Sequence, residues 1–282
     1  MSKLFRAGLR RYIKNIVFWI TLFVSIMVGV FSGILGKTDR QFHDIYIIVA
    51  FIVYAILISL LIGVEFGDGV FRNKIVAGYS RRKIFFSEYI IAIIICLLLV
   101  LVTVVTFSLF NWVIYKQIPI DILAKIALGF VLHIISLITF ISVTSMLVTK
   151  KAVSAIIALA FVFISYMVAF EININLNLPE YGQAYSFVDG IPVEIEGELQ
   201  KNPAYIDSPQ RELYTFVFNI LPTGQIIKYT EIVEPYLTIR HSPGALSVQE
   251  IKLLNTMPLY SVGTIIVYLI SGYLTFRKKD FK

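Results

Sequence analysis

The sequence has little charge and only one cysteine. Charged residues make up 15% of its 282 residues and hydrophobic residues 58%, with a mean hydropathy of +0.82. A soluble domain of this size carries about 25% charged residues. This composition therefore excludes an ordinary water-soluble fold. The lone cysteine, Cys96, lies within an apolar run, so an intrachain disulfide is excluded as well.

Residue sets that support catalysis inside a membrane are also missing. There is no His-x-x-x-His pattern, no cysteine pair and no close pair of acids within the apolar runs. Metal binding and acid-base catalysis need such sets. Gly36-Lys37-Thr38 resembles the end of a phosphate-binding loop, but Phe31 stands where that loop requires glycine. We therefore expect no metal, no cofactor and no catalytic residue on this chain, and any chemistry of ATP and Mg must belong to another polypeptide.

Long apolar runs dominate what remains. Crossing about 30 Å of hydrocarbon takes roughly 20 helical residues, and membrane strands would alternate apolar and polar residues. No such alternation is visible, so we predict an all-α membrane protein with six transmembrane helices. Their expected positions are 15 to 36, 45 to 64, 84 to 115, 122 to 149, 152 to 170 and 257 to 276.

Lysine and arginine are concentrated on one side of these runs. Loops rich in Lys and Arg face the cytosol in multi-pass proteins. The basic side comprises Lys3, Arg6, Arg10, Arg11, Lys14, the cluster from Arg72 to Lys83, Lys150, Lys151, Arg277, Lys278, Lys279 and Lys282. We expect a multi-pass protein of the cell membrane with both termini in the cytosol. The net charge of +7 then reflects topology and the lipid bilayer, and no nucleic-acid partner is expected.

The N-terminal segment is amphipathic. Phe5, Leu9, Tyr12 and Ile13 share one helical stripe, and Lys3, Arg6, Arg10 and Lys14 lie opposite. This pattern predicts an interfacial helix on the inner leaflet, with a plain basic flank as the alternative. In the first span, Ser25, Gly29 and Gly33 form a ridge of small residues that favours close helix packing, either within the chain or between subunits.

Residues 173 to 256 form the sizeable extramembrane segment and hold most of the acids. Within it, the apolar run from Leu213 to Leu221 is too short to span a bilayer and is followed by Pro222, Thr223 and Gly224. We predict a re-entrant hairpin with its turn at these three residues and a second helix over about 225 to 234. Residues 180 to 210 are expected to be a small cap or a loosely ordered loop. The chain would thus divide into 1–172, 173–256 and 257–282.

Few polar groups occur within the spans. His133 lies near the middle of one, followed by Ser136 and Thr139. These side chains are candidates for a substrate pathway. Because steps of three residues drift around a 3.6-residue helix, the alternative is that they make hydrogen bonds between helices.

The insert between the second and third spans is basic and bounded by glycines. Phe71, Ile75 and Tyr79 recur at four-residue spacing, whereas Arg72, Asn73 and Lys74 lie off that stripe. Gly78 can end such a helix in a left-handed conformation. We predict a short cytosolic helix over about 69 to 79.

This insert resembles the coupling region of ABC-2-type permeases, the membrane subunits of ATP-binding cassette exporters. The likeness lies in Glu65, Gly69, Arg72, Asn73, Gly78, Ser80, Arg81 and Ile84. The amphipathic start, the hairpin before the last span and the basic tail agree with it, whereas the outer segment is larger than in compact members.

The resemblance implies a six-span permease subunit that pairs with a second, identical or homologous one and with an ATPase subunit in the cytosol. Phe71, Arg72, Asn73, Lys74, Ile75 and Tyr79 would dock in the ATPase, with Gly69 opening the helix and Glu65 and Arg81 bracketing it. The substrate would be amphipathic or hydrophobic, for example an antimicrobial peptide. Two alternatives stay open: a stand-alone secondary transporter or channel, and a membrane sensor whose outer segment binds a ligand.

Overall fold

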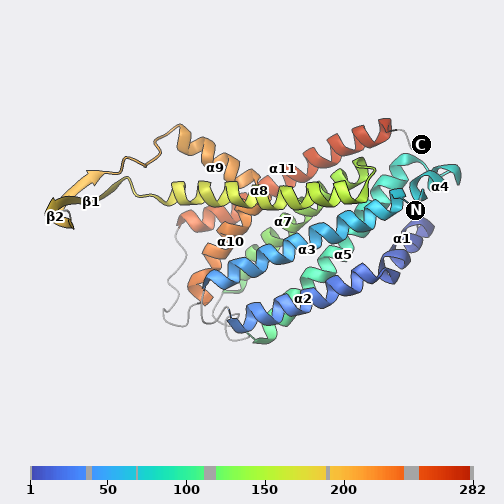
Figure 1. Cartoon of the computed structure of the whole chain (residues 1–282), viewed down its shortest axis with the longest axis horizontal. Coiled ribbons are helices and arrows are strands. Elements are labelled where there is room, and N and C mark those ends of the chain that lie inside the picture. The colour runs from blue at the N-terminus through green and yellow to red at the C-terminus, as the bar shows by residue number, and fades with distance from the viewer. Residues whose placement is uncertain are drawn as a thin grey trace.

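Long helices packed side by side form the body of the molecule (Figure 1). The computed structural model describes residues 2–35, 40–67, 69–110, 119–188, 191–237 and 248–279, so Gly36-Lys37-Thr38 lies outside the described residues. The long helices are α2 (Ile16–Leu35), α3 (Arg40–Gly67), α5 (Arg81–Phe110), α7 (Ile120–Leu147), α8 (Lys151–Asn177) and α11 (Val248–Lys278). Within the described residues each contains a stretch long and apolar enough to cross a membrane. The predicted all-α membrane class with six spans is confirmed.

The expected boundaries differ from the observed helices at several ends. Helix α8 continues to Asn177, past the domain boundary expected at residue 172. Helix α11 begins at Val248, before the start expected at 257. Both helices therefore extend into the segment that we expected to lie wholly outside the membrane domain.

Short elements cover the two ends of the bundle. Helices α1 (Ser2–Lys14) and α4 (Val70–Val76) lie at the end where both chain termini are found (Figure 1). At the opposite end lie β1 (Tyr181–Val188), β2 (Ile191–Lys201), α9 (Gln210–Ile220) and α10 (Pro222–Leu237). The elements around the predicted cytosolic insert and the predicted outer segment are thus at opposite ends of the molecule.

Residues 180 to 210, for which a small cap or a loosely ordered loop was expected, contain a β-hairpin, so the loose loop is excluded over the paired residues. Strands β1 and β2 pair antiparallel, from Tyr181 opposite Lys201 to Val188 opposite Ile191, with a register shift between Gln183 and Tyr185. The hairpin projects well beyond the bundle (Figure 1). The sequence of β2 alternates β-branched residues with glutamates, which is a strand pattern that acidity and turn residues obscured.

The turn between α9 and α10 also differs from the prediction. Leu221 is extended and alone separates the two helices, and Pro222 is the first residue of α10, where a missing N–H costs nothing. Thr223 and Gly224 belong to the same first turn. A Cβ on Gly224 would lie 2.2 Å from the carbonyl oxygen of Phe218, so only glycine allows the two helices to approach this closely.

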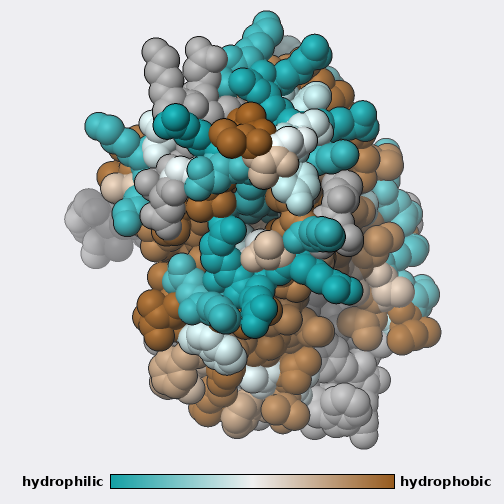
Figure 2. Space-filling view, turned by 90° about the vertical axis from the view of Figure 1, so that its right-hand side faces the viewer, coloured by the Kyte–Doolittle hydropathy of each residue, from teal (hydrophilic) through white to brown (hydrophobic). Residues whose placement is uncertain are grey.

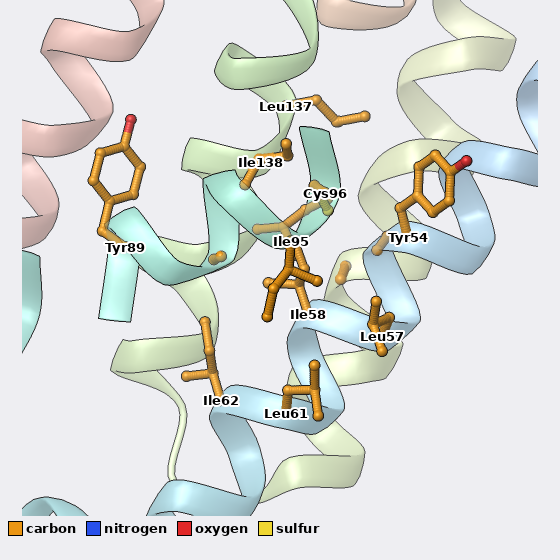
Figure 3. Packing of buried hydrophobic residues seen from close by; sticks show 14 of the residues in the cluster. Tyr54, Leu57, Ile58, Leu61, Ile62, Tyr89, Ile95, Cys96, Leu137 and Ile138 are labelled. Atoms are coloured by element: carbon orange, nitrogen blue, oxygen red, sulfur yellow. The ribbon is translucent and has the colours of Figure 1, made fainter. Parts of the chain in front are cut away.

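The core lies around α3, which packs against α2, α5, α7 and α8. Leu57, Ile58 and Ile62 of α3 are at most 1% exposed and meet buried side chains of the neighbouring helices (Figure 3). The residues that face them include Ile95, Cys96 and Leu99 of α5 and Leu137 and Ile138 of α7. These close contacts make α3 and α5 a firm attachment for the short helix α4 between them.

The ridge of small residues in α2 packs within the chain. A Cβ on Gly29 would lie 1.8 Å from the hydroxyl oxygen of Thr106 and 2.6 Å from the carbonyl oxygen of Thr103, both on α5. The Thr103 hydroxyl donates a hydrogen bond of 3.2 Å to the carbonyl of Ser25. Helices α2 and α5 therefore approach closely at this ridge.

Candidate functional site

Helix α4 is a single short helix that begins and ends at glycines with positive φ. Gly69 has φ of 64° and Gly78 has φ of 84°, in the left-handed region that disfavours other residues. After the helix, the N–H of Gly78 donates to the carbonyl of Ile75 at 2.9 Å and the N–H of Tyr79 to that of Lys74 at 3.1 Å. This pair of bonds is a Schellman motif. The helix thus ends at Val76, three residues before the expected end at 79.

The two faces of α4 have different environments. Phe71 and Lys74 are 1% and 8% exposed, Ile75 and Tyr79 are half-buried, and Arg72, Asn73 and Val76 are exposed. The structure thus turns Phe71 and Lys74 toward the bundle, contrary to the expectation that both would dock in a partner. Positions 71 and 74 are three residues apart and therefore share a face of the helix. The stripe of apolar residues that the sequence indicated, at four-residue spacing from Phe71, did not include Lys74. Val76, 80% exposed, is a surface residue that the sequence pattern did not single out.

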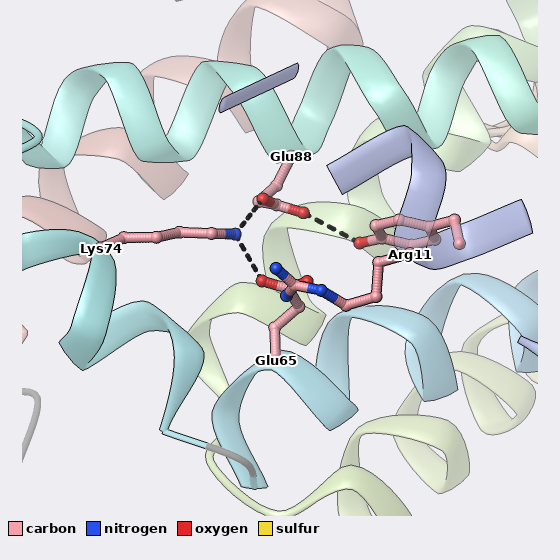
Figure 4. A network of polar contacts seen from close by, with 5 residues as sticks. Arg11, Glu65, Lys74 and Glu88 are labelled. Carbon is pink, nitrogen blue, oxygen red and sulfur yellow. Dashed lines mark hydrogen bonds and ion pairs between the residues drawn. The ribbon is translucent and has the colours of Figure 1, made fainter. Parts of the chain in front are cut away.

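Lys74 lies at the centre of a buried charge network (Figure 4). Its Nζ donates to the carboxylate of Glu65 at the end of α3 and, at 2.5 Å, to Oε1 of Glu88 on α5. Arg11 of α1 pairs with the other oxygen of Glu65. The hydroxyl of Tyr12 donates to Oε2 of Glu88 at 3.0 Å.

This network satisfies charges that would otherwise be costly to bury. Glu65 and Glu88 are 1% and 0% exposed, and the two cations that face them balance their charge. Removing one partner of a buried pair costs about 3–5 kcal/mol, because it leaves an uncompensated charge. Burial and the neighbouring Glu88 raise the pKa of Tyr12, so its phenol stays protonated and acts as the donor. Four elements, α1, α3, α4 and α5, are thereby held together.

The sequence pattern of α1 was only partly correct. Tyr12 is 3% exposed and faces the bundle, whereas Phe5 and Leu9 are partly buried and Ile13 is 41% exposed. Gly8, one turn before Tyr12, lies so close to α5 that a Cβ would come 2.5 Å from Ile91 Cδ1. The helix therefore has three sides: one packed on α5, one apolar and accessible, and one basic. The spacing of Gly8 and Tyr12 at i and i+4 was the signal for the packed side.

Arg81 joins the start of α5 to the end of α11. Its Nη1 donates to the carbonyl oxygens of Arg277 at 2.7 Å and Lys279 at 2.5 Å. Lys279 in turn donates from Nζ to the carbonyls of Met146 and Leu147, at 3.3 and 2.8 Å, at the end of α7. Cations at helix C-termini satisfy carbonyls that lack intrahelical partners. Arg81 therefore holds the start of α5 against the end of α11.

The candidate pathway residues on α7 are all buried. The Ser136 hydroxyl pairs with that of Thr264 on α11 at 2.7 Å, and the Thr139 hydroxyl pairs with that of Tyr89 on α5 at 2.8 Å. His133 lies edge-on to Phe51, and neither ring nitrogen has a hydrogen-bond partner within the described residues. In this conformation Ser136 and Thr139 make interhelical hydrogen bonds, which was the alternative to a pathway role.

The end of the molecule around α4 is strongly basic. Figure 2 shows hydrophilic side chains gathered over this end. Among the residues that the structure describes, the acids here, Glu65 and Glu88, are buried. The exposed charges are Lys3, Arg6, Arg10, Arg11, Lys14, Arg72, Arg82, Lys83, Lys150, Lys151, Arg277 and Lys278.

A family model described as ABC-2 family transporter protein matches residues 78–281. The chain belongs to this family. As an ABC-2 family member it is a multi-pass membrane protein and the permease component of an ABC transporter. A search of the curated proteins finds no match. The matched region runs from the end of the α4 turn to the basic tail, so it does not include α4.

Proposed function

We propose that this ABC-2 permease couples ATP hydrolysis by a separate ATPase subunit to the export of an amphipathic or hydrophobic substrate. The observation that carries the proposal is the construction of α4. One face of this helix is fixed to three other elements through Lys74 and Phe71, and its opposite face presents Arg72, Asn73 and Val76. A helix that is firmly held inside and accessible outside is suited to receive force from a partner.

The orientation of the chain in the membrane is inferred from the distribution of its basic residues. The exposed basic residues around α4 and both termini correspond to the cytosolic side by the positive-inside rule. An ATPase subunit that carries its own ATP and Mg would then reach Arg72, Asn73 and Val76 from the cytosol. Movement of α4 would be passed to α3 and α5 through Glu65 and Glu88, which both bind Lys74.

The substrate class is supported by the outer segment. Residues 180 to 201 carry Glu180, Asp189, Glu194, Glu196 and Glu198 against Lys201. A segment with this excess of acids attracts cationic molecules. A cationic amphipathic peptide, such as an antimicrobial peptide, fits both this charge and the apolar membrane domain. We propose that a second six-helix permease subunit, identical or homologous, completes the pathway in the cell membrane.

The proposal is tested by purifying the chain with its cognate ATPase and measuring the ATPase rate in proteoliposomes. Arg72→Glu combined with Val76→Ser reverses charge and removes apolar area on the exposed face, without touching Lys74 or Phe71. We expect the stimulated rate to fall by about tenfold, since a docking residue of this kind contributes on the order of 1–2 kcal/mol.

Arg10→Glu is the matched control, because it reverses an exposed charge at the same end of the molecule on α1. It should leave the stimulated rate nearly unchanged. An ATPase that neither associates with the chain nor responds to it would contradict the proposal. Transport by the chain alone would favour a stand-alone carrier, and ligand binding without ATP turnover would favour a sensor.

A further inference from the structure

We infer that α11 mechanically connects α4 to α9 and α10, the helices at the opposite end of the molecule, in addition to the connection of α4 to α3 and α5. We also infer that Phe276 and Ser261 are positioning residues for transport. The inference rests on the proposed function, because it requires α4 to be the element that the ATPase moves. Along the chain, α4 is joined only to α3 and α5. The contacts of α11 add a route that the order of the helices does not reveal.

At the inner end, α11 packs on α4 through a pair of aromatic rings. Phe276 is 0% exposed, and its ring centroid lies 6.0 Å from that of Phe71 and 5.3 Å from that of Phe85. One turn earlier, Tyr273 packs on Phe85 at 5.7 Å. The bonds from Arg81 to the carbonyls of Arg277 and Lys279 hold the same end of α11 against α5. Displacement of Phe71 must therefore displace Phe276 as well.

In the outer half, α11 is bonded to α10. The hydroxyl of Ser261, which is 0% exposed, donates to Oε1 of Gln225 at 2.6 Å. Nε2 of Gln225 donates to the carbonyl of Asn219 on α9 at 2.7 Å. One amide side chain thus joins α11 to both outer helices.

Apolar contacts reinforce this outer junction. Leu254 and Met257 of α11 form a buried cluster with Tyr229 and Ile232 of α10. All four side chains are at most 3% exposed. Since packed side chains of this kind move together or repack, α10 has to follow a shift or tilt of α11.

The helix between the two junctions is continuous. Ser261 and Phe276 are both in α11, and at 1.5 Å per residue they lie about 22 Å apart along the axis. Pro258, the proline inside this helix, lies outside the segment between them. A continuous helix transmits an axial shift or a tilt over such a distance. Movement at Phe71 would therefore reach Gln225 without passing through α3 or α5.

A reporter for this movement is available on α10. Thr223 is 3% exposed, and its hydroxyl has no hydrogen-bond partner within the described residues. Cysteine replaces threonine there at similar volume with no hydrogen bond lost. Cys96 is the single cysteine of the chain, so Cys96→Ser with Thr223→Cys leaves one thiol.

The test measures how fast this thiol reacts with a membrane-impermeant maleimide in proteoliposomes that contain the ATPase, with and without ATP, Mg and vanadate. We expect nucleotide trapping to raise the rate about fivefold or more, as for a population shift of roughly 1 kcal/mol. Adding Phe276→Leu should abolish most of this rise while the chain still stimulates the ATPase. Ser261→Ala, which breaks the outer junction only, should do the same.

Phe161→Leu is the matched control, because Phe161 of α8 stacks on Phe140 of α7, and the ring contact with Tyr268 of α11 is made by Phe140, which this change keeps. It should preserve the rise in labelling. The inference is overturned if the rise persists in both Phe276→Leu and Ser261→Ala, or if the unaltered chain stimulates the ATPase with no change at Thr223→Cys. Failure of the unaltered chain to bind the ATPase would instead remove the proposed function, so the two failures are distinguishable.

Discussion

Lys74 is the residue that holds together the helices at the end of the molecule around α4. Its ammonium group lies between the carboxylates of Glu65 and Glu88, which come from two different spans. Its side chain also lies over the ring of Phe71, with Nζ 5.4 Å from the ring centroid. Because both carboxylates are buried, they need cations to remain charged at low cost: Glu88 has Lys74, and Glu65 has Lys74 and Arg11.

Replacing Lys74 by methionine should therefore destabilise the protein strongly. The change keeps the length of the side chain but leaves two buried carboxylates without their shared cation, at a cost of about 3–5 kcal/mol. Thermal unfolding in detergent measures this loss. Lys83→Met, at an exposed position close in sequence, should change stability by less than about 0.5 kcal/mol.

A double variant checks the cause of that loss. Lys74→Met combined with Glu88→Gln removes the carboxylate whose only cation among the described residues is Lys74, so its cost should be smaller than the sum of the two single changes. Strict additivity would contradict the network. It would mean that Lys74 and Glu88 act independently.

Sequence reasoning identified some of these residues but not their arrangement. Glu65 was singled out as flanking α4, and the stripe through Phe71 correctly marked an apolar side. The role of Lys74 could not be predicted in this way, because Glu88 lies 14 residues further along the chain, in another helix, and Arg11 of α1 joins the network only through Glu65. A local pattern shows which residues share a face, and it contains no information about what that face meets.

At the scale of the elements, the packing of α2 on α5 depends on the missing side chain of Gly29. A Cβ on Gly29 would lie 2.6 Å from the backbone carbonyl oxygen of Thr103, and this atom cannot move without shifting α5. Gly29→Leu should therefore separate the two helices and destabilise the bundle by about 1–3 kcal/mol. Thermal unfolding and the yield of folded protein in detergent are the measurements.

Gly263 provides the matched control for this prediction. It lies in the span α11, and a Cβ there would meet nothing within 4 Å. Gly263→Ala should be neutral or stabilise the helix by up to about 1 kcal/mol, through helix propensity. If Gly29→Leu were equally harmless, the close approach of α2 and α5 would be wrong.

The length and type of the elements were predictable to different degrees. The six spans follow from runs of apolar residues that no other structure accommodates, and each appears as a helix. The turn after α9 was misplaced because Pro222 was read as part of a break, whereas a proline in the first turn opens a helix. The strands were missed because a hairpin outside the membrane has no long apolar run to mark it.

At the scale of the whole molecule, the hairpin β1–β2 is the part least connected to the bundle. Its two ends are adjacent, since the N–H of Asn202 donates to the carbonyl of Glu180 at 2.9 Å. Replacing residues 181 to 201 by a short Gly-Ser linker should therefore leave the six spans folded and inserted. The expected change is in substrate range or partner binding, measured by transport assays with peptides of different charge.

A matched variant separates charge from shape in the hairpin. Changing Glu194, Glu196 and Glu198 to glutamine keeps the strands and removes the negative charge of β2. If charge attracts the substrate, this triple variant should change the transport of cationic peptides in the same way as the deletion does. Loss of membrane insertion after the deletion would contradict this account, because it would make the hairpin part of the folding core.

The central claim is that the exposed face of α4 lies in the cytosol and is covered by an ATPase subunit. It is tested most directly with Val76→Cys in the Cys96→Ser chain, since Val76 is 80% exposed. The thiol should react with an impermeant maleimide in inside-out vesicles and become protected about tenfold when the ATPase binds, whereas Arg10→Cys on α1 should remain reactive. Reaction only in right-side-out vesicles, or no protection by the ATPase, would contradict the account.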